Sequence, residues 1–167
     1  MPHPPSPTLK TMKPRITAAA GLVSAVFVLG SLMLFMGGNG NAQIVHTCSS
    51  TDKQFINEAQ LNMAALSSES EDFLHGNAKA GEVISTDRMA LESIRGTGPS
   101  DPSLSKTRAI LTAMFVEYGK AIRADENHKD PGQYVYRAYG LANFAHDVLT
   151  EAQKPLSQHG CDVTGLL

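Results

Sequence analysis

Hydrophobic residues after position 50 recur every three or four positions, which is the spacing of an amphipathic helix. Four segments follow this pattern: residues 51–74, 79–95, 102 to the polar ADENHK stretch, and 131 to about 155. Alternating runs typical of strands are absent from the sequence, and no Asn-Gly or Asp-Gly turn joins two such runs. The pattern therefore predicts an all-α domain, an antiparallel bundle of about four helices.

The polar residues between these segments predict where the helices begin. Thr51, with Gln54 three residues later, has the spacing of a capping box. Asp-Pro pairs at 101–102 and 130–131 place a hydrogen-bond acceptor before a proline, an arrangement typical of a helix start, and Gln133 extends the second pair into a capping box.

Two helix boundaries stay open at the level of sequence. Gly81 and the Ser-Thr-Asp run at 85–87 are weak helix formers, so the second segment could be one helix or two short ones. Pro155 predicts either the end of the fourth helix or a kink in it, because proline removes a backbone hydrogen bond.

The chain has two cysteines, Cys48 and Cys161, one before the first predicted helix and one after the last. An antiparallel bundle brings these two chain positions to the same end, so we expect a disulfide between them in an oxidising compartment. Free thiols or an intermolecular bridge are the alternatives. No Cys-x-x-Cys or Cys/His cluster predicts a metal site.

Residues 16–36 contain no charged side chain and, as a helix, would span about 31 Å, enough to cross a bilayer once. Lys10, Lys13 and Arg15 precede this run, and no charge follows it before Asp52, so we expect the N-terminus in the cytoplasm. A retained anchor is favoured by the length of the run. Cleavage near Ala42, which would release the domain as a secreted protein, is the alternative.

These signals divide the chain into four parts. We expect a disordered cytoplasmic tail at 1–15, a transmembrane helix (signal anchor) at 16–36, a linker at 37–47 and an extracytoplasmic helical bundle at 48–167. The exported part carries a net charge of about −5, and its Lys and Arg residues are scattered singly. Nucleic-acid binding needs a basic surface, so this class of function is excluded.

An aromatic stretch in the fourth segment is the candidate contact surface. We expect Tyr134 and Tyr139 to face the core, whereas Tyr136 points elsewhere beside Arg137. Exposed tyrosine and arginine are typical of protein contacts. The sequence therefore predicts a non-catalytic accessory or scaffold module that contacts another membrane or extracytoplasmic protein through Tyr136 and Arg137.

Catalytic motifs are absent from the sequence. It contains no Gly-x-Ser-x-Gly nucleophile motif, no glycine-rich phosphate loop and no His-Glu-x-x-His metal motif. Both cysteines are expected in the disulfide, so neither is free to act as a nucleophile. We therefore expect no enzyme activity.

A carrier of haem or of another apolar small ligand is the alternative function. The Phe-Leu-His stretch at 73–75, and a Pro-Leu pair at 155–156 before Cys161, resemble in plan the small, exported, disulfide-closed haem-binding helical proteins of actinobacteria. The likeness covers a dozen residues at most, lacks that family's proline after the histidine, and does not assign the chain to it. It implies haem as a possible cofactor, and the candidate ligand residues are His75, Tyr118 and Tyr139.

Overall fold

The computed structural model describes residues 47–167; the predicted tail, transmembrane helix and most of the linker lie outside the described residues. The described part is all-helical, with α2 (Ser50–Leu74), α3 (Ala80–Gly96), α4 (Pro102–Glu126), α5 (Gly132–Gln158) and a short 3₁₀ helix, η1 (Thr164–Leu166). Within it, no helix combines the length and the apolar character that crossing a membrane requires.

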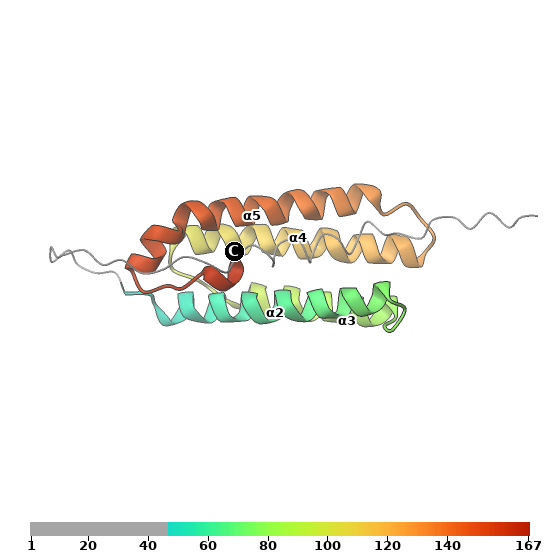
Figure 1. The fold of residues 1–167 in the computed structure, drawn as a ribbon, viewed down its shortest axis with the longest axis horizontal. Coiled ribbons are helices and arrows are strands. Elements are labelled where there is room, and N and C mark those ends of the chain that lie inside the picture. The colour runs from blue at the N-terminus through green and yellow to red at the C-terminus, as the bar shows by residue number, and fades with distance from the viewer. Residues whose placement is uncertain (1–46) are drawn as a thin grey trace, which may run out of the picture.

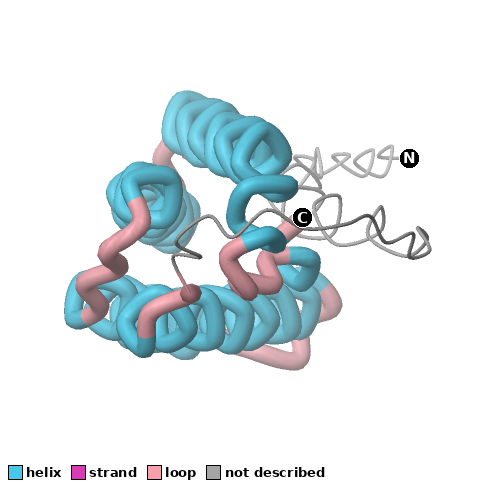
Figure 2. The backbone as a smooth tube through the Cα atoms, turned by 90° about the vertical axis from the view of Figure 1, so that its left-hand side faces the viewer, coloured by secondary structure: helices cyan, strands magenta, loops and turns pink. Residues whose placement is uncertain are grey.

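The four long helices run up and down in chain order, so that each is antiparallel to the next (Figure 1). Helix α4 packs against α3 and α5, and α2 packs against α3. The C-terminal segment turns back after α5, and η1 contacts both α2 and α5 (Figure 2). The predicted antiparallel helical bundle is confirmed, with the C-terminal segment as an additional piece between its first and last helices.

The hydrophobic core is made by the apolar faces that the sequence pattern predicts. Aromatic and branched aliphatic side chains from all four helices are fully buried: Phe55, Leu66, Val83, Ile94, Leu104, Phe115, Ile122, Leu149 and Leu156. Val163 of the C-terminal segment is buried with them, and Leu166 and Leu167 pack against the cluster. Burial of such side chains is the main force that stabilises helices of this length.

The start of α4 is as predicted, since the Asp101 side chain accepts hydrogen bonds from the backbone N–H groups of Ser103 and Leu104. The predicted starts of the first and fourth helices are wrong by one or two residues. The capping box of α2 is formed by Ser49 and Asp52, not by Thr51 and Gln54. Helix α5 begins at Gly132, whose backbone N–H donates a hydrogen bond to the side chain of Asp130.

Two boundaries that the sequence leaves open are resolved by the structure. Helix α3 is one continuous helix. At its start, the side chain of Glu82 accepts a hydrogen bond from the backbone N–H of Lys79, the N-cap residue. Helix α5 continues through Pro155 to Gln158. A proline in the last turn removes a single intrahelical hydrogen bond, so the helix tolerates it.

The predicted disulfide between Cys48 and Cys161 is present and links chain positions 113 residues apart. It joins the start of α2 to the segment after α5, at the end of the bundle where α2 begins and α5 ends (Figure 1). The backbone N–H of Cys48 also donates to the carbonyl of His159, at 2.6 Å. The two chain ends of the domain are therefore held by a covalent bond and a hydrogen bond together.

Asp52 ties the same end of the bundle to the α3–α4 loop. Its buried carboxylate accepts hydrogen bonds from the backbone N–H and hydroxyl of Ser49, from the backbone N–H and hydroxyl of Ser100, and from the backbone N–H of Asp101. Burial by itself raises the pKa of Asp52, but the bonds from Ser49, Asp101 and Ser100 outweigh it and lower the pKa to about 2.

We expect Asp52→Asn to lower the free energy of unfolding by about 2 kcal/mol at pH 7, because the amide loses the charge and two of its acceptor lone pairs. The pKa of the folded state lies below the ordinary value of 3.8, so this stabilisation is present above about pH 4 and is lost as the pH falls toward 2. Urea denaturation at pH 7 and at pH 2.5 measures both effects. Asp72→Asn, an exposed change on the same helix, is the control and is expected to shift stability by less than about 0.5 kcal/mol.

Candidate functional site

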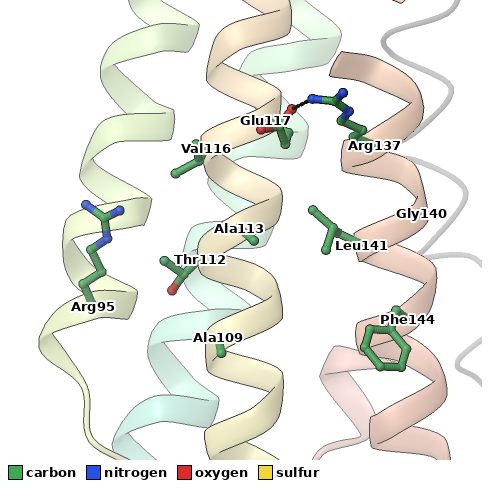
Figure 3. A pocket seen from close by; sticks show the side chains of 10 residues that line it. All are labelled: Arg95, Ala109, Thr112, Ala113, Val116, Glu117, Arg137, Gly140, Leu141 and Phe144. Carbon is green, nitrogen blue, oxygen red and sulfur yellow. Dashed lines mark ion pairs between the residues drawn. The ribbon is translucent and has the colours of Figure 1, made fainter. Parts of the chain in front are cut away.

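A groove of about 750 Å³ lies over α4 between α3 and α5, and we call it the α4/α5 groove (Figure 3). It is lined mainly by small and apolar side chains, with charged groups at its edges: Arg95, Ala109, Thr112, Ala113, Val116, Glu117, Arg137, Gly140, Leu141 and Phe144. Its size is within the range of sites that hold small ligands or a side chain of a partner protein.

The groove exists because small residues of α4 and α5 lie next to one another where the two helices face each other. Ala109 and Ala113 lie one turn apart on α4, and Gly140 of α5 has no neighbouring atom within 4 Å of the position that a Cβ would occupy. Leu141 and Phe144 form the α5 wall (Figure 3). Two helices with larger residues at these positions would close the same space.

Phe144 is held in place at the edge of the groove while it remains partly exposed. The ammonium nitrogen of Lys106 lies 5.0 Å from the centre of its ring, which is a cation–π distance. Even so, 47% of the side chain is accessible to solvent. A large apolar ring exposed at a surface is a common feature of contact sites.

Charged groups are placed at the rim of the groove. Glu117 is largely buried and pairs with Lys120 at 2.6 Å and, more weakly, with Arg137 at 3.8 Å. Arg95 lies on the α3 side of the groove (Figure 3). With Lys106 above Phe144, the rim carries an excess of positive charge on a domain whose overall charge is negative.

The predicted contact residues both lie on the exposed surface of α5. Arg137 lines the groove and Tyr136 is 78% exposed, as its expected orientation away from the core requires. Tyr139 was expected to face the core and is instead 41% exposed. Ala138 and Leu141 face inward, and Tyr139 lies about 100° from the first and about 160° from the second around the helix, outside the buried stripe.

The candidate ligand residues His75, Tyr118 and Tyr139 occupy three different surroundings. His75 is the exposed C-cap of α2, and its Nδ1 lies 2.8 Å from the carbonyl oxygen of Glu71. Tyr118 is buried, and its hydroxyl lies 2.6 Å from the hydroxyl of Ser70. A role for the three residues in holding a ligand stays a prediction.

The structure reveals a buried carboxyl group, Asp87 of α3, that the sequence analysis did not single out. It is 3% exposed, and its Oδ1 atom has no hydrogen-bond partner among residues 47–167. Burial raises its pKa to about 7, against a lowering effect of the charge on Arg123. The carboxyl group packs so closely on Gly119 of α4 that a Cβ there would collide with Oδ2.

Tyr118 completes this buried polar group. Burial raises the pKa of Tyr118, the hydrogen bond between Tyr118 and Ser70 acts in the opposite direction, and the nearby Asp87 raises the pKa further. The sequence did contain a signal for Asp87, because it lies four residues after Val83 and three before Ala90, both of them core residues. A charged residue in the middle of an apolar helix face marks a position where the core contains a polar group.

One cluster of potential metal ligands lies at the disulfide end, where Cys48, Asp52 and Cys161 are close together. The two sulfur atoms are bonded to each other, so neither is a thiolate available to a metal. The carboxylate of Asp52 is occupied by its hydrogen bonds with Ser49 and the α3–α4 loop. The cluster is therefore explained by its structural role.

Comparisons of the chain with protein-family models, with curated proteins and with solved structures give no match.

Proposed function

We propose that this protein is a membrane-anchored, extracytoplasmic helical module that acts by protein–protein contact as a non-catalytic accessory or scaffold subunit. The observation that carries the proposal is the concentration of accessible apolar surface on α5. Among residues 47–167, six large hydrophobic side chains are exposed, and three of them, Tyr136, Tyr139 and Phe144, lie on this helix; of these, Phe144 lines the α4/α5 groove.

The composition of this surface supports contact rather than catalysis. One aromatic side chain, Phe144, and two arginines, Arg95 and Arg137, line a largely apolar groove. Aromatic and arginine side chains are enriched at the centres of protein interfaces. The carboxylate at the groove, Glu117, is paired with Lys120 and Arg137, so its charge is already compensated.

The proposed compartment rests on two features of the chain. The uncharged run at 16–36 is long enough to anchor the protein in a membrane, and positive residues precede it. A disulfide between Cys48 and Cys161 is stable on the oxidising side of that membrane. The membrane is thus one proposed partner, and another membrane or extracytoplasmic protein is the second.

Site-specific photo-crosslinking of the full-length protein in its native membranes tests the proposal. A crosslinker at Tyr136 is expected to give a discrete adduct with another polypeptide chain, because this side chain stands at the edge of the proposed contact surface. The matched control is a crosslinker at Leu61, which is 60% exposed on α2. Equal labelling at both positions, or no adduct at either, would contradict the proposal.

A carrier of an apolar small ligand, haem included, is the second candidate. It is favoured by the size of the α4/α5 groove and by the small apolar residues in its floor. Native protein that retains a lipid or haem after purification, and gives no adduct from Tyr136, would favour this function over protein contact.

A further inference from the structure

One face of α5 carries exposed residues along most of its length, and we call it the α5 stripe. Its members recur at helical spacing on the side opposite the core: Gln133, Tyr136, Arg137, Gly140, Asn143, Phe144, Asp147 and Glu151. All eight are exposed in the described part of the chain. The stripe borders the α4/α5 groove through Arg137, Gly140 and Phe144.

The order of residues in the α5 stripe is symmetric about Gly140. Tyr136 lies one helical turn before it and Phe144 one turn after it. A second α5 helix that crosses antiparallel at Gly140 would bring Tyr136 of each copy against Phe144 of the other. Because no neighbouring side chain fills the space over Gly140, the two backbones can approach closely at the crossing point.

Charges along the stripe favour the same antiparallel arrangement. Arg137 lies before Gly140, whereas Asp147 and Glu151 lie after it. In the antiparallel pair, Asn143 of one copy is opposite Arg137 of the other, and Asp147 is four residues further, about 6 Å along the axis. An arginine side chain spans this distance. A parallel pair would instead place like charges opposite each other.

Arg137 is available for such a contact. Its side chain is 59% exposed, and its nearest acidic partner within the chain, Glu117, is 3.8 Å away, longer than a hydrogen bond. Glu117 keeps Lys120 as a partner at 2.6 Å if Arg137 turns outward. The positive groove rim and the acidic pair Asp147 and Glu151 are therefore complementary parts of one surface.

We infer that two copies of this chain associate through α5 across a two-fold axis near Gly140, with Tyr136 of each copy seated in the other's α4/α5 groove beside Phe144. The inference rests on the proposed contact function and names a second copy as the partner. A second copy is favoured over another occupant because the same helix provides the groove wall, the aromatic side chain that fills the groove, and both signs of charge. Two-fold interfaces require this self-complementarity.

The test is a charge exchange in the full-length protein, purified in mild detergent, with the dimer fraction measured by light scattering over a range of protein concentrations. Arg137→Asp and Asp147→Arg are each expected to raise the dissociation constant of the dimer at least tenfold. The double variant Arg137→Asp with Asp147→Arg is expected to return within about threefold of the unmodified protein. Lys53→Asp, an exposed charge reversal on α2, is the control and leaves the constant unchanged.

The rescue separates contact between copies from damage within one copy. Arg137→Asp places a new carboxylate near Glu117 of the same chain, and Asp147→Arg does not relieve that repulsion. Recovery in the double variant therefore reports a contact between copies, and circular dichroism shows whether each variant keeps its helix content.

Several outcomes would overturn the inference. These are a monomer at every concentration, a monomer that retains lipid in the groove, a dimer insensitive to both single changes, or a double variant that is not rescued. If the chain is monomeric while a crosslinker at Tyr136 captures a different protein, the inference fails and the proposed function stands. If neither a dimer nor an adduct forms, both fail.

Discussion

Replacing both cysteines, Cys48→Ala with Cys161→Ala, is expected to lower the free energy of unfolding by about 4 to 5 kcal/mol. The disulfide closes a loop of 113 residues, and on the chain-entropy model a cross-link of this span restricts the unfolded chain strongly. Since domains of this size are stable by about 5 to 15 kcal/mol, the loss removes a large part of the total. Urea or guanidinium unfolding of the oxidised protein and the double variant measures the difference.

The unmodified protein unfolded in the presence of a reductant is the matched control and should agree with the double variant. Contacts that do not depend on the disulfide remain at this end, including the hydrogen bonds of Asp52 and the buried Val163. We therefore expect the variant to fold at low temperature and to unfold earlier. A loss below about 1 kcal/mol would mean that these contacts alone hold the chain ends together.

Asp87→Asn is expected to raise the free energy of unfolding at pH 8 by about 2 to 4 kcal/mol, an unusual sign for a change at a buried position. Burial raises the pKa of the folded Asp87 to about 7 from 3.8, so the folded state binds its proton more tightly than the unfolded state does. The unmodified protein therefore has its full stability below about pH 4 and loses part of it as the pH rises to 7. The amide of the Asp87→Asn variant does not ionise, so its stability does not fall in this way as the pH rises.

Denaturation curves of Asp87→Asn and of the unmodified protein from pH 4 to pH 8 measure this effect. The two proteins should have similar stability at pH 4 and diverge as the pH rises. Asp72→Asn, at an exposed position, is again the control. If Asp87→Asn is less stable than the unmodified protein at pH 8, the carboxylate takes part in stabilising interactions that outweigh its burial.

The two buried aspartates act in opposite directions on the pH dependence of stability. Asp52 has a lowered pKa and contributes above about pH 4, whereas Asp87 has a raised pKa and costs stability as the pH approaches 7. Together these two groups place maximum stability in acidic solution, near pH 4. Asp52→Asn with Asp87→Asn would remove both contributions and flatten the curve.

The helices were predictable because local signals and periodicity agreed. The hydrophobic spacing indicated four helices, and the two cysteines lay where an antiparallel bundle would bring them together. The first helix start was predicted two residues late, because Ser49, Ser50 and Thr51 are all competent caps. The choice of Ser49 depends on Asp52, which is also held by the α3–α4 loop, and that loop is distant in sequence.

The candidate site was only partly predictable, for a related reason. Tyr136 and Arg137 were expected on a contact surface, and the structure places both on the exposed side of α5. The α4/α5 groove depends on small residues meeting across two helices, at Ala113 and Gly140, and the register of this meeting is not contained in either helix alone. Asp87 could have been found from its place in an apolar helix face, although its missing hydrogen-bond partner could not.

The covalent and hydrogen-bonded links between distant parts of the chain are concentrated at one end of the bundle. The disulfide, the Asp52 hydrogen bonds and the Cys48–His159 bond all lie there, whereas the loops at 75–79 and 127–131 close the opposite end. Fraying should therefore begin at those loops, with amide exchange slowing progressively toward the disulfide. Tyr136 lies one turn from the start of α5, at the end where fraying is expected. This half of α5 can therefore shift when a partner binds, whereas the half near the disulfide keeps its position and sets the alignment of the two proteins.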